Sequence, residues 1–350
     1  MSDFDEYIRQ GEPGRSAKAA AWQTAIGLQD VDGLKPSAYL VDTAKRHIEG
    51  DITIDQVKRL IDTYYKSRQG RLSTEEERTE EADKVSARIT GLLQEDTFSF
   101  GPAEYQRIHR NLFEGLFKFA GEYRDYNISK NEWVLNGDSV LYNPFENLKE
   151  TLDYDFAEER KFDYASASTE EAIKHLAAFI AGIWQIHPFG EGNTRTTAVF
   201  LIKYLRSFGF SINNDLFAAH SWYFRNALVR ANYSNRSKGI TATNRYLVLF
   251  LRNLILGENN SLSNRVMHVF AQSIKPDSPK SQIDTLSCTL EEQVVLKAVE
   301  ENPHITQAEL KTAIGKSIAT VKRLTISLQK KGFLVRKNGK RNGFWEVLKS

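Results

Sequence analysis

Apolar residues recur every three or four positions along most of the chain, which is the spacing of amphipathic helices. The clearest runs lie at 38–48, 55–65, 104–119 and 170–186. The segment 66–83 is instead highly charged and lacks this spacing, so it is predicted to be a linker or an exposed helix. The pattern as a whole predicts a mainly α fold.

One stretch departs from the helical pattern. Residues 131–142 contain two short runs, apolar in part, on either side of Asn136-Gly137. That dipeptide is the strongest short-range signal for a β-hairpin, because the favoured two-residue turn needs positive φ at both positions. The sequence therefore predicts a hairpin here, packed by Trp133 and Leu141.

A different organisation begins after a Pro- and Ser-rich stretch at 275–281, which is typical of a linker. Apolar spacing then predicts helices at 290–299, 306–314 and 317–331, and alternation over 333–347 predicts a terminal hairpin. Three helices followed by a hairpin is the plan of winged helix-turn-helix domains, which this part of the chain resembles.

Basic residues gather on the third of these helices and on the hairpin. Such a stripe can neutralise phosphates on both sides of a DNA groove. Many basic runs are only solvated, however, and winged helices also serve as protein-contact modules. DNA and protein thus both stay open as partners, and the candidate DNA-binding residues are Lys316, Lys322, Arg323, Lys337, Lys340 and Arg341.

Composition narrows the class of protein without deciding its chemistry. The chain has 350 residues, enough for two or three domains. Its 47 basic and 45 acidic residues give a net charge of +2, so no global field indicates a partner. The single cysteine, Cys288, excludes an internal disulfide framework and fits a reducing compartment. Without an apolar run near the ~20 residues of a membrane span or a signal-peptide core, we expect a cytoplasmic protein with no membrane partner.

The candidate chemistry is concentrated at 187–195, which reads His-Pro-Phe-Gly-Glu-Gly-Asn-Thr-Arg. Proline and two glycines interrupt the helical run at 170–186, and a second apolar run follows at 199–205. The segment is therefore predicted to be a loop between two helices, with its Asn-Thr-Arg end opening the second. Backbone N–H groups in such a turn, together with a helix start, form a binding site for phosphate.

Three side chains in this loop suit phosphate chemistry. His187 can take a proton from an attacking hydroxyl. Glu191 is the hard oxygen ligand that Mg²⁺ prefers, and Arg195 offers a forked donor to a phosphate oxygen. A histidine before a proline can also be a plain helix cap. The order of the residues and their setting between helices favour a site for phosphoryl transfer.

The loop resembles the signature of the Fic (filamentation induced by cAMP) family, His-x-Phe-x-Asp/Glu-Gly-Asn-Gly-Arg-x-x-Arg. The resemblance implies a Fic-type helical bundle that transfers AMP from ATP to a Ser, Thr or Tyr hydroxyl of a target protein or of itself. His187 would be the catalytic base, and Glu191 would hold Mg²⁺. The residues that would bind the nucleotide are Gly190, Gly192, Asn193, Thr194 and Arg195.

Two positions depart from the signature. Thr194 stands where the family has Gly, and Ala198 stands where it has the second Arg, which grips the γ-phosphate. A charge-assisted hydrogen bond is typically worth ~1.5–3 kcal/mol. Ala198 therefore indicates an enzyme that holds ATP differently or prefers another nucleotide. The alternative is a DNA-binding regulator whose Fic core binds nucleotide without catalysis, but the intact base favours the enzyme.

The resemblance also gives functions to segments outside the loop. The predicted hairpin would be the Fic flap, which holds the target by strand addition, with Trp133, Val134 and Leu135 as the residues that bind it. The helix that includes 221–230 often faces the nucleotide base in the family. Its Trp222 could equally pack in the core, with Arg225 solvated.

The segments 27–37 and 48–57 resemble the small antitoxins that accompany Fic toxins. Those antitoxins carry a Ser/Thr-x-x-x-Glu-Gly helix whose Glu pairs with the second Arg of the signature. The corresponding positions here are Leu28, Asp32 and Gly33. Asp32 is therefore a candidate regulatory residue, although an ordinary turn would also favour Asp and Gly.

These expectations combine into three parts. Residues 1–70 would form a helical antitoxin-like segment, and 84–270 a Fic catalytic core with a β-hairpin flap. Residues 285–350 would form a winged helix-turn-helix domain, which is α with a short β-wing.

Overall fold

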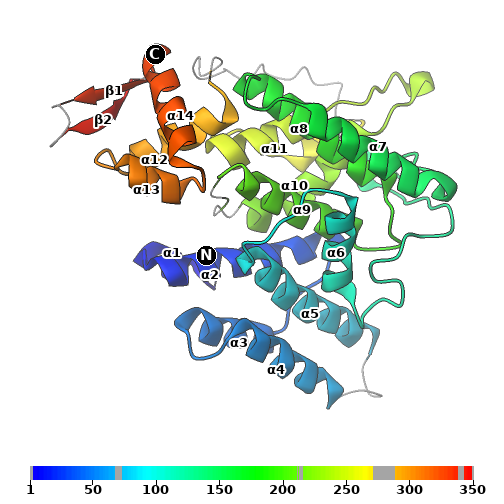
Figure 1. Cartoon of the computed structure of the whole chain (residues 1–350). Helices are drawn as coiled ribbons and strands as arrows, with labels where there is room; N and C mark the ends of the chain where they lie inside the picture. The colour runs from blue at the N-terminus through cyan, green and yellow to red at the C-terminus, as the bar shows by residue number, and fades with distance from the viewer. Residues whose placement is uncertain are drawn as a thin grey trace.

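The computed structural model describes residues 3–67, 73–210, 212, 216–270, 288–337 and 343–348. Within these ranges the chain is mainly helical, as the apolar spacing predicts (Figure 1). None of the described helices combines the length and hydrophobicity needed to cross a membrane. The predicted linker at 275–281 lies outside the described residues.

The N-terminal helices pack around a small core of their own, which includes Trp22, Leu40 and Ile61. Ser37 and Thr53 start two of these helices, because each side chain accepts a hydrogen bond from a backbone N–H in the first turn. The elements are α1 (Asp5–Gln10), α2 (Pro13–Gly27), η1 (Leu28–Asp32), α3 (Ala38–Glu49) and α4 (Ile54–Lys66).

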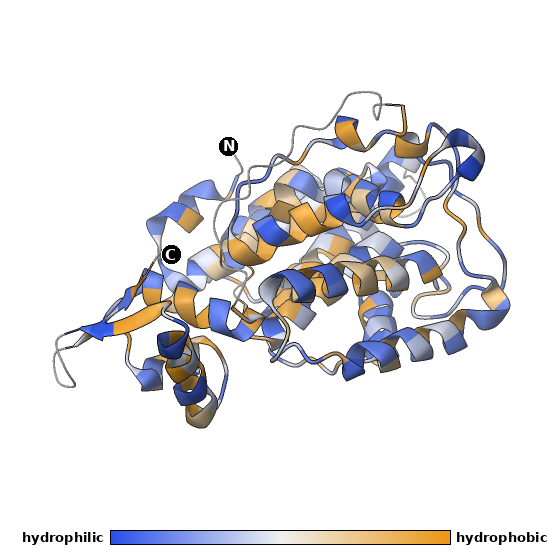
Figure 2. Cartoon of the chain, turned by 90° about the horizontal axis from the view of Figure 1, so that it is seen from above, coloured by the Kyte–Doolittle hydropathy of each residue, from blue (hydrophilic) through white to orange (hydrophobic). Residues whose placement is uncertain are grey.

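The central helices surround the second and larger core, and Figure 2 shows hydrophobic residues concentrated along helices in the middle of the molecule. The charged segment after residue 72 proves to be the start of a helix rather than a linker. The helices are α5 (Thr74–Gln94), α6 (Pro102–Phe113), α7 (Leu148–Lys161), α8 (Thr169–Ile186), α9 (Asn193–Ser207), α10 (Leu216–Ala231) and α11 (Arg245–Leu256), with short turns η2 (Trp133–Leu135), η3 (Phe145–Asn147), η4 (Arg236–Lys238) and η5 (Asn264–Met267).

The C-terminal elements follow the predicted order of three helices and a hairpin. The two strands pair antiparallel, with Leu334 opposite Val347. Their helices dock on the central core, where Gly209 lies so close to Ile314 that an added Cβ would be 2.5 Å from its carbonyl oxygen. The elements are α12 (Leu290–Glu301), α13 (Gln307–Ala313), α14 (Ile318–Lys330), β1 (Leu334–Lys337) and β2 (Phe344–Val347).

The predicted β-hairpin at 131–142 is only half right. Asn136 and Gly137 adopt positive φ of 57° and 89°, so the tight turn is present. The flanking residues form no β-strand, and η2 takes the place of the first one. The physical reason is that Val134 and Leu135 are both buried, whereas neighbours in a strand point to opposite faces.

Candidate functional site

The segment 187–195 is a loop between α8 and α9, as predicted. His187 follows the last turn of α8 with a positive φ of 50°, and α9 begins at Asn193. Gly192 precedes it with φ of 78°, and a Cβ there would lie 2.3 Å from the ring of Phe113. Only glycine satisfies both requirements, because a side chain would be strained and would clash.

His187 is held in its neutral form. Its Nδ1 lies 3.2 Å from the carbonyl oxygen of Trp184, which can only accept, so Nδ1 carries the proton. The other nitrogen, Nε2, is buried and has no hydrogen-bond partner among the described residues. Burial, followed by the charge of Lys130, lowers the pKa of His187 well below its ordinary value. The lone pair on Nε2 is thus free to accept a proton.

Thr194 supports this histidine from behind. Its hydroxyl accepts a hydrogen bond of 3.0 Å from the indole Nε1 of Trp184. The Trp184 ring in turn stands edge-on to the imidazole of His187, with 5.3 Å between centroids. The side chain at this departure from the signature is therefore directed into the protein and leaves the loop clear. Ala198, the second departure, is completely buried.

Asn193 closes the loop on itself. Its Oδ1 accepts from the N–H of Phe189 at 3.1 Å, and its Nδ2 donates to the carbonyl of the same residue at 2.7 Å. Sequence analysis placed this side chain on the nucleotide. The structure shows it engaged in holding the loop, so its amide fixes the direction of the neighbouring backbone N–H groups.

His109 is a support that sequence analysis missed. Its Nδ1 accepts from the N–H of Gly121 at 2.8 Å, so its Nε2 donates to the carbonyl of Glu191 at 3.0 Å. The ring also stacks on Phe189 at 3.7 Å. Burial lowers the pKa of His109 to about 4, which keeps the ring neutral and both bonds intact. In the sequence it is a histidine at a core position of a helix, which carries no functional signal.

Arg195 is buried and surrounded by acceptors. One guanidinium nitrogen donates to Gln29 at 3.1 Å and another donates to Glu81 at 2.7 Å. Its Nε lies 2.9 Å from Asp32, an ion pair without hydrogen-bond geometry. The guanidinium also lies over the ring of Phe113. The structure thus brings Asp32 to the motif, and adds two partners that no motif indicated.

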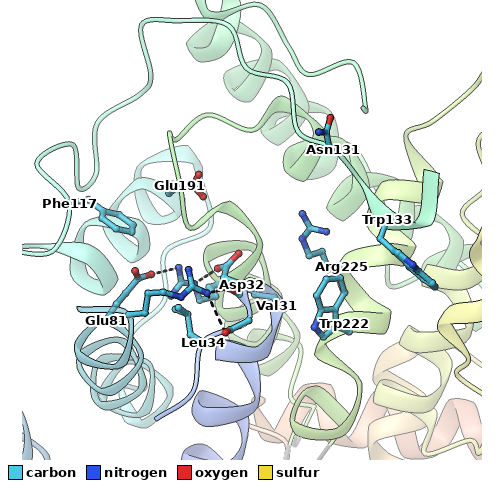
Figure 3. A pocket seen from close by; sticks show the side chains of 13 residues that line it. Val31, Asp32, Leu34, Glu81, Phe117, Asn131, Trp133, Glu191, Trp222 and Arg225 are labelled. Carbon is cyan, nitrogen blue, oxygen red and sulfur yellow. Dashed lines mark hydrogen bonds and ion pairs between the residues drawn. The ribbon is translucent and has the colours of Figure 1, made fainter. Parts of the chain in front are cut away.

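Arg195, Asp32 and Glu81 border a cavity of about 540 Å³, a size typical of small-molecule sites. Figure 3 shows Glu81 and Asp32 on one side, with Arg225, Trp222 and Trp133 on the other. Five parts of the chain contribute to the lining: η1 with the residues that follow it, α5, the loop, α10, and the segment between α6 and α7. The lining residues are Val31, Asp32, Gly33, Leu34, Arg78, Glu81, Phe117, Asn131, Trp133, Glu191, Arg195, Trp222 and Arg225.

Glu191 points its carboxylate into this cavity and is half exposed. The ammonium group of Lys130 lies 3.0 Å from this carboxylate and forms an ion pair with it in this conformation. The described residues contain no cluster of three metal-binding side chains. Mg²⁺ is commonly held by one or two carboxylates together with substrate phosphates. A single carboxylate beside the start of α9 would fit that mode if the loop binds phosphate, as the sequence predicts.

Comparison with known proteins identifies the central part of the chain. Residues 99–205 match the Fic/DOC family model. They form a Fic/DOC domain. The match extends from before α6 almost to the end of α9 and includes the whole loop. The N-terminal helices and the C-terminal elements lie outside it.

One curated relative is the probable protein adenylyltransferase y4lH of Sinorhizobium fredii (strain NBRC 101917 / NGR234). It is 32% identical over 115 residues, which cover 32% of this chain and 56% of that protein. The chain thus spans about half the length of the curated relative that it matches.

The segment at 130–142, which we call the flap segment, lies beside the loop of the Fic/DOC domain. Of its three predicted target-binding residues, Trp133 is exposed at the cavity, while Val134 and Leu135 are buried. The Val134 carbonyl already accepts from the N–H of Val269. Trp222 likewise lines the cavity. The alternative prediction of a solvated Arg225 is wrong, because two hydrogen bonds join its guanidinium to Glu132.

The positive charges of several basic residues in the C-terminal elements are partly neutralised by nearby carboxylates. Lys316 and Arg323 both lie within ion-pair distance of Glu291, at 3.1 and 3.5 Å. Lys337 pairs with Glu346 across the strands at 3.1 Å. Lys322 is exposed on α14, and Lys340 and Arg341 lie outside the described residues. These ion pairs reduce the positive charge offered to a phosphate backbone, and DNA binding stays a prediction.

Proposed function

We propose that this chain is a protein adenylyltransferase, which transfers AMP from ATP to a hydroxyl side chain of a target protein or of itself. The observation that carries the proposal is the state of His187, a neutral histidine with an unpartnered, buried Nε2. It begins a loop whose Glu191 and Arg195 line a nucleotide-sized cavity. The Fic/DOC match and the name of the relative support the same reaction class.

In the proposed reaction the target hydroxyl oxygen attacks the α-phosphorus of ATP. The bond from that phosphorus to the bridging oxygen breaks, pyrophosphate leaves, and the hydroxyl proton passes to Nε2 of His187. The first N–H groups of α9 lack partners within the helix, as at every helix start, and would face the charge on the phosphate. Asn193 and His109 would keep the loop in the conformation that presents them.

Glu191 would hold Mg²⁺ together with the phosphates, and the ion when bound would offset the charge on the departing pyrophosphate. Lys130 must then release the Glu191 carboxylate. Because this lysine belongs to the flap segment, nucleotide loading and flap position would be linked.

Asp32 would act as a regulator of this site. Arg195 would bind the β-phosphate of the nucleotide, yet Asp32 and Glu81 hold it in the described conformation. A phosphate can replace these carboxylates only by competing for the same guanidinium. The resemblance implied pairing with the second signature Arg, which is absent here, and Asp32 pairs with the first Arg instead. The described conformation is therefore the restrained one.

The test is transfer of label from each of the four α-³²P nucleoside triphosphates, with Mg²⁺, to the chain itself and to proteins of a cell lysate. The expected result is label from ATP that is lost in His187→Ala, with nucleotide binding retained. His304→Ala, which changes an exposed histidine, is the matched control. Absence of label from every nucleotide, also in an Asp32→Asn/Glu81→Gln protein whose Arg195 is released, would overturn the proposal.

A further inference from the structure

Glu132 is a completely buried carboxylate on the flap segment. Arg225 of α10 donates two hydrogen bonds to it, at 2.6 and 3.1 Å. The hydroxyl of Tyr142 donates a third at 3.3 Å. A charged carboxylate is buried only when such partners replace its water, so the three side chains form one unit.

The backbone of Glu132 fixes this unit to the turn. Its carbonyl accepts from the N–H groups of Leu135 and Gly137, and its own N–H donates to the carbonyl of Asp138. The main chain that carries the carboxylate is therefore fixed to the turn. Arg225 anchors it from the opposite side, where its guanidinium lies over the ring of Trp222 and borders the cavity.

Tyr142 transmits this arrangement to the base. Its ring lies against the imidazole of His187, with centroids 4.3 Å apart. The imidazole is thus enclosed by two aromatic rings, Tyr142 on the flap side and Trp184 on the helix side. Each ring has one polar anchor, since Thr194 holds the Trp184 indole and Glu132 holds the Tyr142 hydroxyl.

We propose that Glu132 is a positioning residue of the transfer reaction: its carboxylate, fixed by Arg225, holds Tyr142 against the imidazole of His187. The positioning role rests on the proposed function, but the contact between Tyr142 and His187 can be tested without nucleotide. Glu132 does not border the cavity, so it acts on the base without touching the nucleotide.

The first test is the rate at which diethyl pyrocarbonate modifies His187, followed by peptide mass spectrometry. In the wild-type chain Nε2 is buried, so the rate should be low. In Glu132→Gln we expect a rise of about tenfold, the ratio set by loss of a charge-assisted hydrogen bond. Arg225→Gln should give a similar rise, and the double variant no more than either alone, because both act through one unit.

Asp138→Asn is the matched control. Asp138 is a second carboxylate on the same turn that also pairs with a distant cation, but its carboxylate is bonded to Lys238 and Tyr233, whereas the Tyr142 hydroxyl donates to Glu132. In Asp138→Asn the rate of His187 modification should equal that of the wild type. An equal rise in this control would show general loosening of the flap segment and would overturn the proposal, as would an unchanged rate in Glu132→Gln.

Two further measurements keep the result decisive. Tyr142→Phe loses only the hydroxyl contact and should show a smaller rise of the same sign, even if Glu132→Gln fails to fold. In the transfer assay Glu132→Gln should lower kcat about tenfold and leave the KM for ATP unchanged. A raised KM with kcat intact would overturn the positioning role. If His187 responds to modification but no protein transfers label, the contact stands and the proposed function fails.

Discussion

The loop at 187–195 and the flap segment at 130–142 border the same cavity. Two loop side chains are held by neighbours in the sequence, whereas two carboxylates of the flap segment are held by cations far along the chain. In the loop, Asn193 bonds to Phe189 four residues away, and His187 bonds to Trp184 three residues away. In the flap segment, Glu132 bonds to Arg225 across 93 residues, and Asp138 bonds to Lys238 across 100. Contacts between neighbouring residues are visible in the sequence as a short motif. Contacts between distant residues leave no such motif in either of the two segments that meet.

The loop should therefore fail when one local contact is removed. In Asn193→Ala the backbone N–H groups lose their fixed direction, and transfer should fall by roughly 10²–10³-fold, as when one oxyanion donor is lost. Asn131→Ala changes an exposed asparagine of the flap segment at the same cavity and should alter the rate less than about threefold. Label transfer at saturating ATP measures both. Equal losses would abolish the contrast between the two regions.

The support of the loop by His109 predicts a pH dependence of stability. The pKa of this ring is about 4 in the folded chain, below the ordinary value of 6.5 that it regains on unfolding. The unfolded chain thus binds the proton first, so stability is complete above pH 6.5 and declines as the pH falls toward 4. The loss from this group should reach about 3 kcal/mol.

Urea denaturation at a series of pH values measures this decline. His109→Gln should be less stable than the wild type at neutral pH and should show a shallower decline between pH 6.5 and 4. His304→Gln makes the same substitution at an exposed histidine outside the loop and serves as the control. An identical slope in His109→Gln would contradict the assignment.

The guanidinium of Arg195 is held by side chains that are all distant in the sequence, so it should respond as the flap segment does. Asp32→Asn together with Glu81→Gln removes both charges that hold it. We expect ATP to bind roughly ten- to a hundredfold more tightly, because phosphates no longer compete with carboxylates. Isothermal titration calorimetry measures the change. Glu80→Gln, which loses only an ion pair with Lys84 on the same helix, is the control.

The smallest effect is expected at the turn of the flap segment. Asn136 has a positive φ of 57°, which costs an alanine about 1 kcal/mol. Asn136→Ala should lower the free energy of unfolding by that amount, and Asn136→Gly should not. Denaturation in urea distinguishes the two. A neutral Asn136→Ala would indicate that the distant contacts alone set this turn.

Much of the fold follows from the sequence, because helices depend on local spacing and caps. Helices start where Thr306 and Ser317 provide capping side chains, and the turn forms at Asn136-Gly137. The flap strands failed as a prediction, since Val134 and Leu135 are both buried in a turn that packs against α10 and η5, which follow much later in the chain. Glu81 and Glu132 were missed because a carboxylate gives no signal until its distant arginine is known.

By itself, the sequence determined the helices, the loop between α8 and α9, and the chemistry that the loop can supply. These rest on contacts within a few residues and on the intrinsic properties of His, Glu, Gly and Arg. Only the tertiary structure decided which groups surround Arg195, why Asn193 faces the loop, and how Glu132 reaches His187 through Tyr142. Each of these requires two distant segments to meet, and that encounter is set by burial of the whole core rather than by neighbours in the chain.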